Sequence, residues 1–228
     1  MQIKTDKKYL DECFHFVFCQ DMARGSLIVF EGCDKSGKST QCKKLVEALN
    51  KREIAAEQWR FPERSTKIGQ IINSYMEKEC ELHDVAVHLL FSANRWEFLP
   101  LMKEKIEQGT TIVVDRYAYS GVAFTSAKGY DIEWCKACDR GLPMPDQVFC
   151  LDIPIDEAST RGDFGRERYE VSDFQKVVRK KFGALKDESW QVIDARDTFE
   201  SIHKKICDAT VEIIINNQNK NLDMSLFM

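Results

Sequence analysis

Residues 31–40 read EGCDKSGKST, and this stretch decides the fold. A glycine at 32, followed after four residues by Gly37, Lys38 and Ser39, is the pattern of a phosphate-binding loop. Gly32 and Gly37 let backbone N–H groups curl around phosphate oxygens. Lys38 is expected to reach the β- and γ-phosphates, and the Ser39 hydroxyl is expected to ligate Mg²⁺. The loop therefore predicts a site for a nucleoside triphosphate.

The sequence on both sides of the loop supplies the context that this motif requires. The apolar run SLIVFE precedes it as a predicted strand, and a segment with one apolar stripe follows it as a predicted helix. Strand and helix patterns continue to alternate, which predicts an α/β protein with a parallel sheet covered by helices on both faces. The predicted strands are residues 26–31, 54–60, 110–114, 147–152 and 190–194. The predicted helices are residues 38–51, 81–108 (kinked or split at Pro100), 173–187 and 198–214.

The chain is predicted to form one globular domain, residues 24–216, with less integrated ends. Residues 1–23 form an N-terminal extension, which is either dispensable, with Met22 as an alternative start, or ordered as a helix over residues 7–19. Residues 217–228 form a polar tail that we expect to be frayed. Residues 162–168, GDFGRER, interrupt the regular pattern with glycines and arginines.

The composition excludes several classes of protein. Of the 228 residues, 43% are hydrophobic and 31% are charged, and the net charge of −4 argues against a nucleic-acid partner. The apolar run near the N-terminus is too short to span a membrane or to form a secretory signal. The nine cysteines suit a reduced intracellular protein, and we expect the CxxC of Cys135 and Cys138 to be free helix cysteines and not a metal site. We expect a cytoplasmic location and leave nuclear residence open.

The segment TTIVVDRY places Asp115 at the end of a predicted buried strand. Ligand groups in parallel α/β folds lie at the carboxyl ends of strands, so Asp115 is expected to hold Mg²⁺ directly or through water. The alternative is that Asp115 only caps the next helix. A GTPase would carry an Asn-Lys-x-Asp motif, which neither NKRE at 50–53 nor NKNL at 219–222 provides. Kinases of small molecules remain.

Arginines near the predicted strand ends indicate the class of acceptor. An acceptor phosphate is already ionised near neutral pH, so it needs cations and no general base. Arg60, Arg64 and Arg116 are candidates, although a solvated surface charge is the alternative for each. Phe91 and Arg95 share one predicted helix face, where a ring can stack on a base and a guanidinium can donate to pyrimidine carbonyls. Core packing is the alternative for Phe91. The pattern favours a nucleotide acceptor over a nucleoside.

Several segments together resemble one known family. The chain resembles the eukaryotic thymidylate kinases, most closely the animal and poxvirus forms, which transfer the γ-phosphate of ATP to dTMP. The resemblance implies a P-loop NTPase fold with a five-stranded parallel sheet, Mg²⁺ with ATP as donor, a mobile lid over about residues 161–172, and a homodimer packed through helices such as the one predicted over 81–108. The matching segments are GSLIVFEGCDKSGKSTQ, RFPERST-IG, HLLFSANRWE, VVDRYAYSGVAFT, GLPMPD and FGRERYE.

The resemblance also assigns roles to individual residues. Asp34 would accept from the deoxyribose 3′-hydroxyl, Phe91 would stack on thymine, and Arg95 would hydrogen-bond the base. Phe124 and Tyr169 would crowd the sugar and disfavour ribonucleotides. The implied dTMP site is Asp34, Phe61, Arg64, Phe91, Arg95, Arg116, Ser120, Phe124, Tyr169 and Gln175. The implied ATP site is Gly32, Cys33, Asp34, Lys35, Ser36, Gly37, Lys38, Ser39, Thr40 and Arg161, the last near adenine. The implied catalytic residues are Lys35, Lys38, Asp115, Arg116, Arg166 and Arg168, and the implied metal ligands are Ser39 and Asp115.

One departure from the family pattern concerns the residue after the loop aspartate. Many cellular members place an arginine there and use it on the transferred phosphoryl group, whereas this chain has Lys35. Lysine keeps the charge but loses the planar fork of arginine. Arg166 and Arg168 in the lid would compensate.

Two alternatives to a kinase specific for dTMP stay open. The first is a pyrimidine nucleoside monophosphate kinase that also takes dUMP or analogues. The second is a nucleotide-binding protein without turnover, which the retained Lys38, Ser39, Asp115 and Arg116 argue against.

Overall fold

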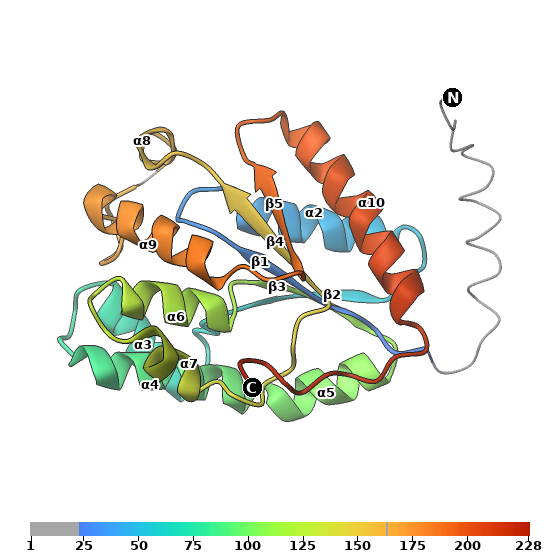
Figure 1. Ribbon diagram of the computed structural model, residues 1–228, viewed down its shortest axis with the longest axis horizontal. Coiled ribbons are helices and arrows are strands. Elements are labelled where there is room, and N and C mark those ends of the chain that lie inside the picture. The colour runs from blue at the N-terminus through green and yellow to red at the C-terminus, as the bar shows by residue number, and fades with distance from the viewer. Residues whose placement is uncertain (1–22, 163) are drawn as a thin grey trace.

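A parallel sheet of five strands forms the centre of the protein (Figure 1). This computed structural model describes residues 23–162 and 164–228. The strand order is β2-β3-β1-β4-β5, which confirms the predicted α/β fold; the predictions for residues 1–22, including Met22 as a start, lie outside the described residues. The strands are β1 (Leu27–Glu31), β2 (Ala56–Arg60), β3 (Thr111–Asp115), β4 (Gln147–Asp152) and β5 (Trp190–Asp194).

Helices connect the strands and cover both faces of the sheet (Figure 1). Pro100 splits the long predicted helix in two and lies in the first turn of the second part. Backbone N–H groups in a first turn have no acceptor within the helix, so proline, which lacks the N–H, is tolerated there. The helices that match predicted patterns are α2 (Lys38–Asn50), α4 (Asp84–Glu97), α5 (Leu99–Glu107), α9 (Ser172–Leu185) and α10 (Phe199–Asn217). The helices that the sequence patterns did not predict are α3 (Lys67–Met76), α6 (Ala118–Ser126), α7 (Ile132–Ala137) and α8 (Ile155–Ala158).

The central strand β1 contributes to a hydrophobic core on each side of the sheet. Its successive side chains point to opposite faces, and all of them are buried. Leu27 and Val29 pack with residues of α5, α6 and α9, whereas Ile28 and Phe30 pack with residues of α2 and α10. The carboxyl end of β1 is therefore held between two packed layers, and this fixes the start of the loop that follows.

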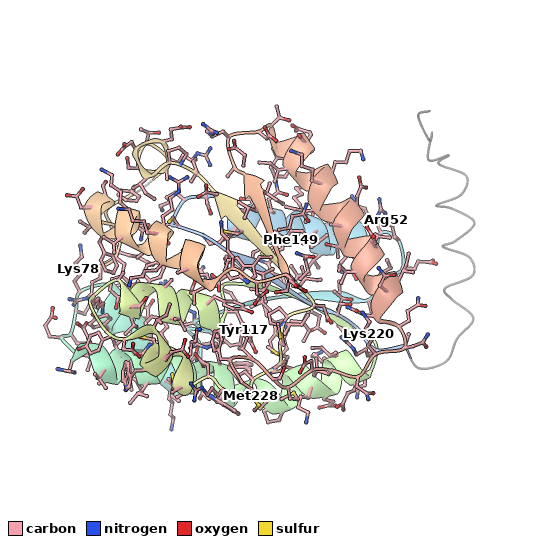
Figure 2. All side chains as sticks on the ribbon, viewed as in Figure 1. Arg52, Lys78, Tyr117, Phe149, Lys220 and Met228 are labelled. Carbon is pink, nitrogen blue, oxygen red and sulfur yellow. The ribbon has the colours of Figure 1, made fainter. Side chains whose placement is uncertain are left out.

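The C-terminal tail is packed, so the prediction of a frayed end was wrong. It runs from the end of α10 back across the molecule toward α7 (Figure 1), and Lys220 and Met228 mark its course in Figure 2. Leu226 is 1% exposed, and its N–H and C=O bond the backbone of Leu142 and Gly141. Most residues of the tail are polar, which led to the prediction of a frayed end. Its few apolar side chains nevertheless pack into the hydrophobic core that includes Leu27 and Val29. Among the described residues, no helix combines the length and the apolar character that a membrane span would require.

Candidate active site

The loop between β1 and α2 has the backbone conformation that its glycines predict. Gly32 has φ 132°, and a side chain there would meet the Leu151 carbonyl oxygen at 2.4 Å, so only glycine fits. Gly37 has φ 96° and is the N-cap residue of α2. Cys33 and Ser36 are buried within the loop, whereas Thr40 is exposed on the first turn of α2.

Lys38 lies inside this loop and is 5% exposed. Its Nζ donates to the carbonyl oxygen of Cys33 at 2.6 Å and to the hydroxyl of Ser36 at 3.2 Å. Burial, and after it the positive charge of Arg116, lowers the pKa of Lys38 to about 8. A phosphate in the loop would supply the negative charge that this buried ammonium group lacks.

Ser39 and Asp115 meet at the carboxyl ends of β1 and β3. The Ser39 hydroxyl donates to Asp115 Oδ2, and Asp115 is 2% exposed. Such oxygen donors fit Mg²⁺, which takes one or two protein ligands and completes its shell with phosphates and water. Across residues 23–162 and 164–228, no group of three or more His, Cys, Asp or Glu side chains could hold a metal ion. The pair of Ser39 and Asp115 suits a cation that arrives with a phosphorylated ligand.

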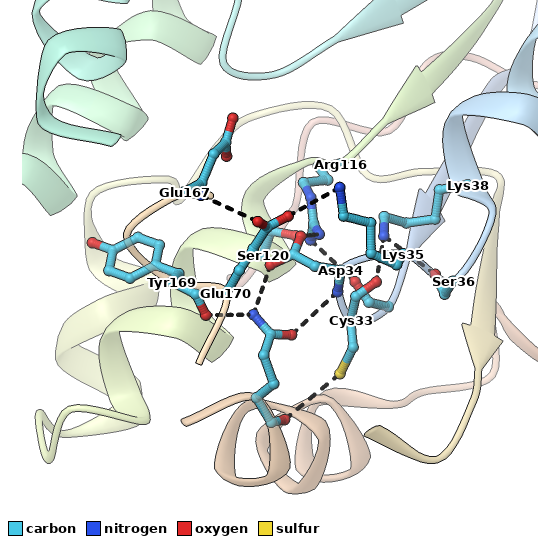
Figure 3. Close-up of polar contacts among 12 residues, drawn as sticks. Cys33, Asp34, Lys35, Ser36, Lys38, Arg116, Ser120, Glu167, Tyr169 and Glu170 are labelled. Carbon is cyan, nitrogen blue, oxygen red and sulfur yellow. Dashed lines mark hydrogen bonds and ion pairs between the residues drawn. The ribbon is translucent and has the colours of Figure 1, made fainter. Parts of the chain in front are cut away.

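Asp34 joins the loop to the rest of the site (Figure 3). Its Oδ1 pairs with the Arg116 guanidinium, and its Oδ2 accepts from Gln175 Nε2 at 2.6 Å. Gln175 is fully buried; its Oε1 accepts from the Asp34 N–H, and its Nε2 also donates to the Tyr169 carbonyl. The carboxylate is thus oriented on two sides by groups from α9 and from the turn after β3.

Arg116 is held in place by the predicted residue Ser120 and, through it, by Glu31, which the sequence patterns did not identify. Its φ is 70°, its N–H donates to the Phe30 carbonyl, and its Nη1 donates to the Ser120 hydroxyl at 3.0 Å. Glu31, which is fully buried, accepts from the N–H groups of Tyr117 and Ser120 and from the Ser120 hydroxyl. Burial raises the pKa of Glu31. Glu31 therefore fixes the first turn of α6, from which Ser120 orients Arg116.

A cleft beside the loop gathers the residues predicted for the acceptor. All of them except Gln175 line it, and Gln175 contacts Asp34 and Tyr169 from behind. Phe124 and Tyr169 form one wall, with ring centroids 5.5 Å apart. Phe91 is half-buried and lines the cleft, so it is more than a core residue. The predicted residues in the lining are Asp34, Phe61, Arg64, Phe91, Arg95, Arg116, Ser120, Phe124 and Tyr169, and Arg60 lines it too.

Arg95 enters the cleft as one half of a buried ion pair. Its side chain is 2% exposed, and that of its partner Asp139 is 0% exposed. Burial alone would lower the pKa of Arg95, but the charge and hydrogen bonds of Asp139 raise it above its usual value. The sequence patterns missed Asp139, because 44 residues separate it from Arg95 and no local motif surrounds it.

Glu170 connects the predicted lid to the loop (Figure 3). Its Oε2 accepts from the backbone N–H groups of Gly165, Arg166 and Glu167 at 2.9 to 3.1 Å. Its Oε1 lies 3.3 Å from Lys35 Nζ. Lys35, a candidate for the cation that acts on the transferred phosphoryl group beside the lid arginines, is here an ion-pair partner of the lid.

The lid arginines lie in different environments. Arg168 stacks on Tyr75 and donates to Glu81 and to the carbonyls of Tyr75 and Cys80, so the structure does not bring it to the loop. Arg161 donates to the carbonyls of Lys35 and Ala195.

Arg166 lines a groove between the lid and α3, together with Arg64, Glu77 and Glu167. Arg64 itself donates to Glu167 at 2.7 Å and to Asn73 at 2.7 Å. Arg166 therefore lines the same groove as the predicted phosphate ligand Arg64.

Comparisons with known proteins identify what the chain resembles as a whole. A family model described as thymidylate kinase matches residues 30–206. The thymidylate kinase of Danio rerio is 55% identical over 195 residues, which cover 84% of this chain and 92% of that protein. The thymidylate kinase of Arabidopsis thaliana is also 55% identical, over 183 residues that cover 80% of this chain and 70% of that protein, so the similarity extends beyond animal forms. A solved thymidylate kinase from Candida albicans superposes with a TM-score of 0.77 at 38% identity, covering 88% of this chain and 96% of that chain.

Proposed function

This chain belongs to the thymidylate kinase family, and on that premise we propose that it transfers the γ-phosphate of ATP to dTMP, giving dTDP and ADP. One observation carries the proposal beyond the family relationship. The cleft lined by the predicted acceptor residues meets the phosphate-binding loop at Asp34 and Arg116, so a donor and an acceptor can lie end to end. In-line transfer between two phosphates needs this arrangement.

Catalysis in this site rests on positioning and electrostatics. When ATP binds, Lys38 would give up its hydrogen bond to the Cys33 carbonyl and donate to the β- and γ-phosphates instead. Arg116 neutralises the acceptor phosphate, which lets two anions approach each other. Mg²⁺ would be held by Ser39 and Asp115 and would neutralise charge on the phosphate oxygens. Asp34 accepts from the sugar hydroxyl of the acceptor, so one loop fixes the distance between both substrates.

The decisive experiment is coupled ADP release with ATP and dTMP. We expect turnover that depends on dTMP and that Lys38→Ala abolishes. The matched control is Lys43→Ala, which removes an exposed lysine from the same helix and should leave turnover unchanged. If no nucleoside monophosphate elicits ADP release from the wild-type protein, it is a nucleotide-binding protein without turnover.

The range of acceptors is a separate question. The Candida albicans enzyme is a thymidylate kinase of broad substrate specificity. For this chain we expect dTMP to give the highest kcat/KM in a panel that includes dUMP, dCMP and UMP. A comparable kcat/KM for dUMP would instead indicate a pyrimidine kinase of wider range.

We also propose a homodimer packed through the outer faces of α3 and α4. Large apolar side chains lie exposed there: Ile71 on α3, and Leu89 and Trp96 seven residues apart on α4. Burial of these side chains against a second copy would remove them from water. Size exclusion coupled to light scattering should give a molecular mass twice that of the chain. The Leu89→Arg variant should give the mass of a single chain. A wild-type monomer at micromolar concentration would refute the dimer.

A further inference from the structure

One edge of the Arg95 guanidinium binds Asp139, and the other edge faces the cleft. Nε lies 3.1 Å from Asp139 Oδ1, and Nη2 lies 2.5 Å from Asp139 Oδ2. Among the described residues, Nη1 has no hydrogen-bond acceptor, and Arg95 lines the cleft together with Phe91. The N–H groups that remain on Nη1 and Nη2 are therefore available to a ligand.

Asp139 cannot turn away from this pairing, because its surroundings fix it. Its Oδ1 also accepts from the Ser92 hydroxyl at 2.8 Å, and its backbone N–H donates to the Lys136 carbonyl at 3.1 Å. The preceding carbonyl, that of Cys138, accepts from the Trp96 indole and lies 2.9 Å from the Ser92 hydroxyl, which shares its one proton between this oxygen and Asp139. Two of these groups, Ser92 and Trp96, lie on α4, the same helix that carries Arg95.

We propose that Asp139 is the positioning residue for base recognition: it holds the Arg95 guanidinium so that the remaining N–H groups meet the carbonyl oxygens of a pyrimidine in the cleft. Asp139 touches no substrate itself. The inference rests on the proposed function, since it assigns a means of orientation to the acceptor site. A carboxylate fixes the plane of a guanidinium through two charge-assisted hydrogen bonds. An amide at this position would place an N–H₂ donor opposite an arginine donor. One of the two hydrogen bonds would be lost, and the plane of the Arg95 guanidinium would no longer be fixed.

Asp139→Asn tests the proposal through the separation of KM from kcat. We expect KM for dTMP to rise about tenfold, with kcat changed less than about threefold and KM for ATP unchanged, because only acceptor binding is affected. Calorimetric titration with dTMP should show the same loss of affinity. Glu133→Gln is the matched control, because Glu133 is an exposed acid of α7 that pairs only at the surface. It should change none of these values.

A double-mutant cycle separates positioning from general structural support. If Asp139 acts through Arg95, the variant Arg95→Ala with Asp139→Asn should bind dTMP as weakly as Arg95→Ala alone. Additive losses, or an equal rise in KM for ATP, would overturn the proposal while leaving dTMP kinase activity of the wild type intact. Absence of that activity in the wild type would refute the proposed function instead.

A gentler variant keeps the test valid if Asp139→Asn fails to fold. Ser92→Ala removes one hydrogen bond from Asp139 Oδ1 and leaves the ion pair in place. We expect it to raise KM for dTMP about twofold, with KM for ATP unchanged. No change in dTMP binding, with Asp139→Asn unfolded, would count against the proposal.

Discussion

Lys38 shows how a single buried charge makes substrate binding depend on pH. Burial and the charge of Arg116 lower its pKa to about 8, so the free protein loses this proton as the pH rises through that value. A bound triphosphate holds the proton on, because its negative charge favours the ammonium form. ATP binding must then take up a proton above the pKa and becomes weaker there.

The expected result is a dissociation constant for ATP that rises about tenfold between about pH 7 and about pH 9. The measurement is calorimetric titration with ATP in buffers across this range. The control is Lys43→Ala, which should show the same profile as the wild type. A dissociation constant that stays level across the range would show that Lys38 remains charged in the free protein.

Lys35 is a second residue whose role a conservative change can decide. Its Nζ lies 3.3 Å from Glu170 Oε1, and its φ is 59°. Arginine can adopt this φ as readily as lysine can. We expect Lys35→Arg to keep the ion pair and to retain at least wild-type kcat with dTMP, since arginine supplies the same charge in a planar fork. Steady-state kinetics of the two proteins provide the measurement. A clear drop in kcat would count against a direct phosphoryl role for Lys35.

At the residue scale, the sequence predicts a contact well where a local motif fixes it. The spacing of Gly32, Lys38 and Ser39 is sufficient to place a loop, because Lys38 bonds Cys33 and Ser36 of the same turn. Asp139 and Glu31 could not be predicted in this way. Their partners Arg95 and Ser120 lie 44 and 89 residues away, and only the packing of helices brings them together.

At the scale of elements, strands were predicted better than helices that are buried all round. Helix α6 has the sequence AYSGVAFTS, and most of its residues are buried, so it has no polar face and no helical period. Helix α4 has such a period and was predicted. Both helices line the cleft, so the side formed by α4 could be predicted from its pattern, whereas the side formed by α6 could not.

Gly121 permits the close approach of α6 to α4. A methyl group there would lie 3.0 Å from Arg95 Nη2, which is held by Asp139 and cannot retreat easily. Alanine favours a helix by about 1 kcal/mol over glycine, and this gain opposes the strain against Arg95, so Gly121→Ala should change Tm little. It should still raise KM for dTMP several-fold by displacing the guanidinium. Thermal unfolding and kinetics on one preparation measure both effects, and an unchanged KM would show that Arg95 adapts freely.

The lid provides a second prediction at this scale. Arg166→Ala should slow the phosphoryl-transfer step about tenfold if lid cations compensate for Lys35. Arg168→Ala should loosen the lid, because Arg168 binds Glu81 and two backbone carbonyls, and should increase tryptic cleavage within residues 161–170. Single-turnover kinetics and timed proteolysis measure the two effects. If neither variant slows the chemical step, compensation by the lid is wrong.

At the scale of the whole molecule, the C-terminal tail connects the end of the chain to the acceptor site. Its Asp223 and Leu226 bond the backbone of residues 141–144, the segment that directly follows Asp139. Phe227 packs edge-on against Tyr119 of α6, with ring centroids 5.3 Å apart. The sequence suggested a frayed end, since polar residues predominate there and the apolar ones find their partners only in the folded protein.

Leu226→Ala should therefore affect both stability and acceptor binding. Leu226 is 1% exposed, and truncation of such a side chain costs about 2–5 kcal/mol in the free energy of unfolding. Loosening of the segment after Asp139 should also raise KM for dTMP about threefold while KM for ATP stays unchanged. Chemical denaturation and kinetics measure the two effects. The control is Ile215→Ala, which removes a partly exposed apolar side chain from α10. A loss of stability without any change in KM would show that the tail supports the core but does not reach the acceptor site.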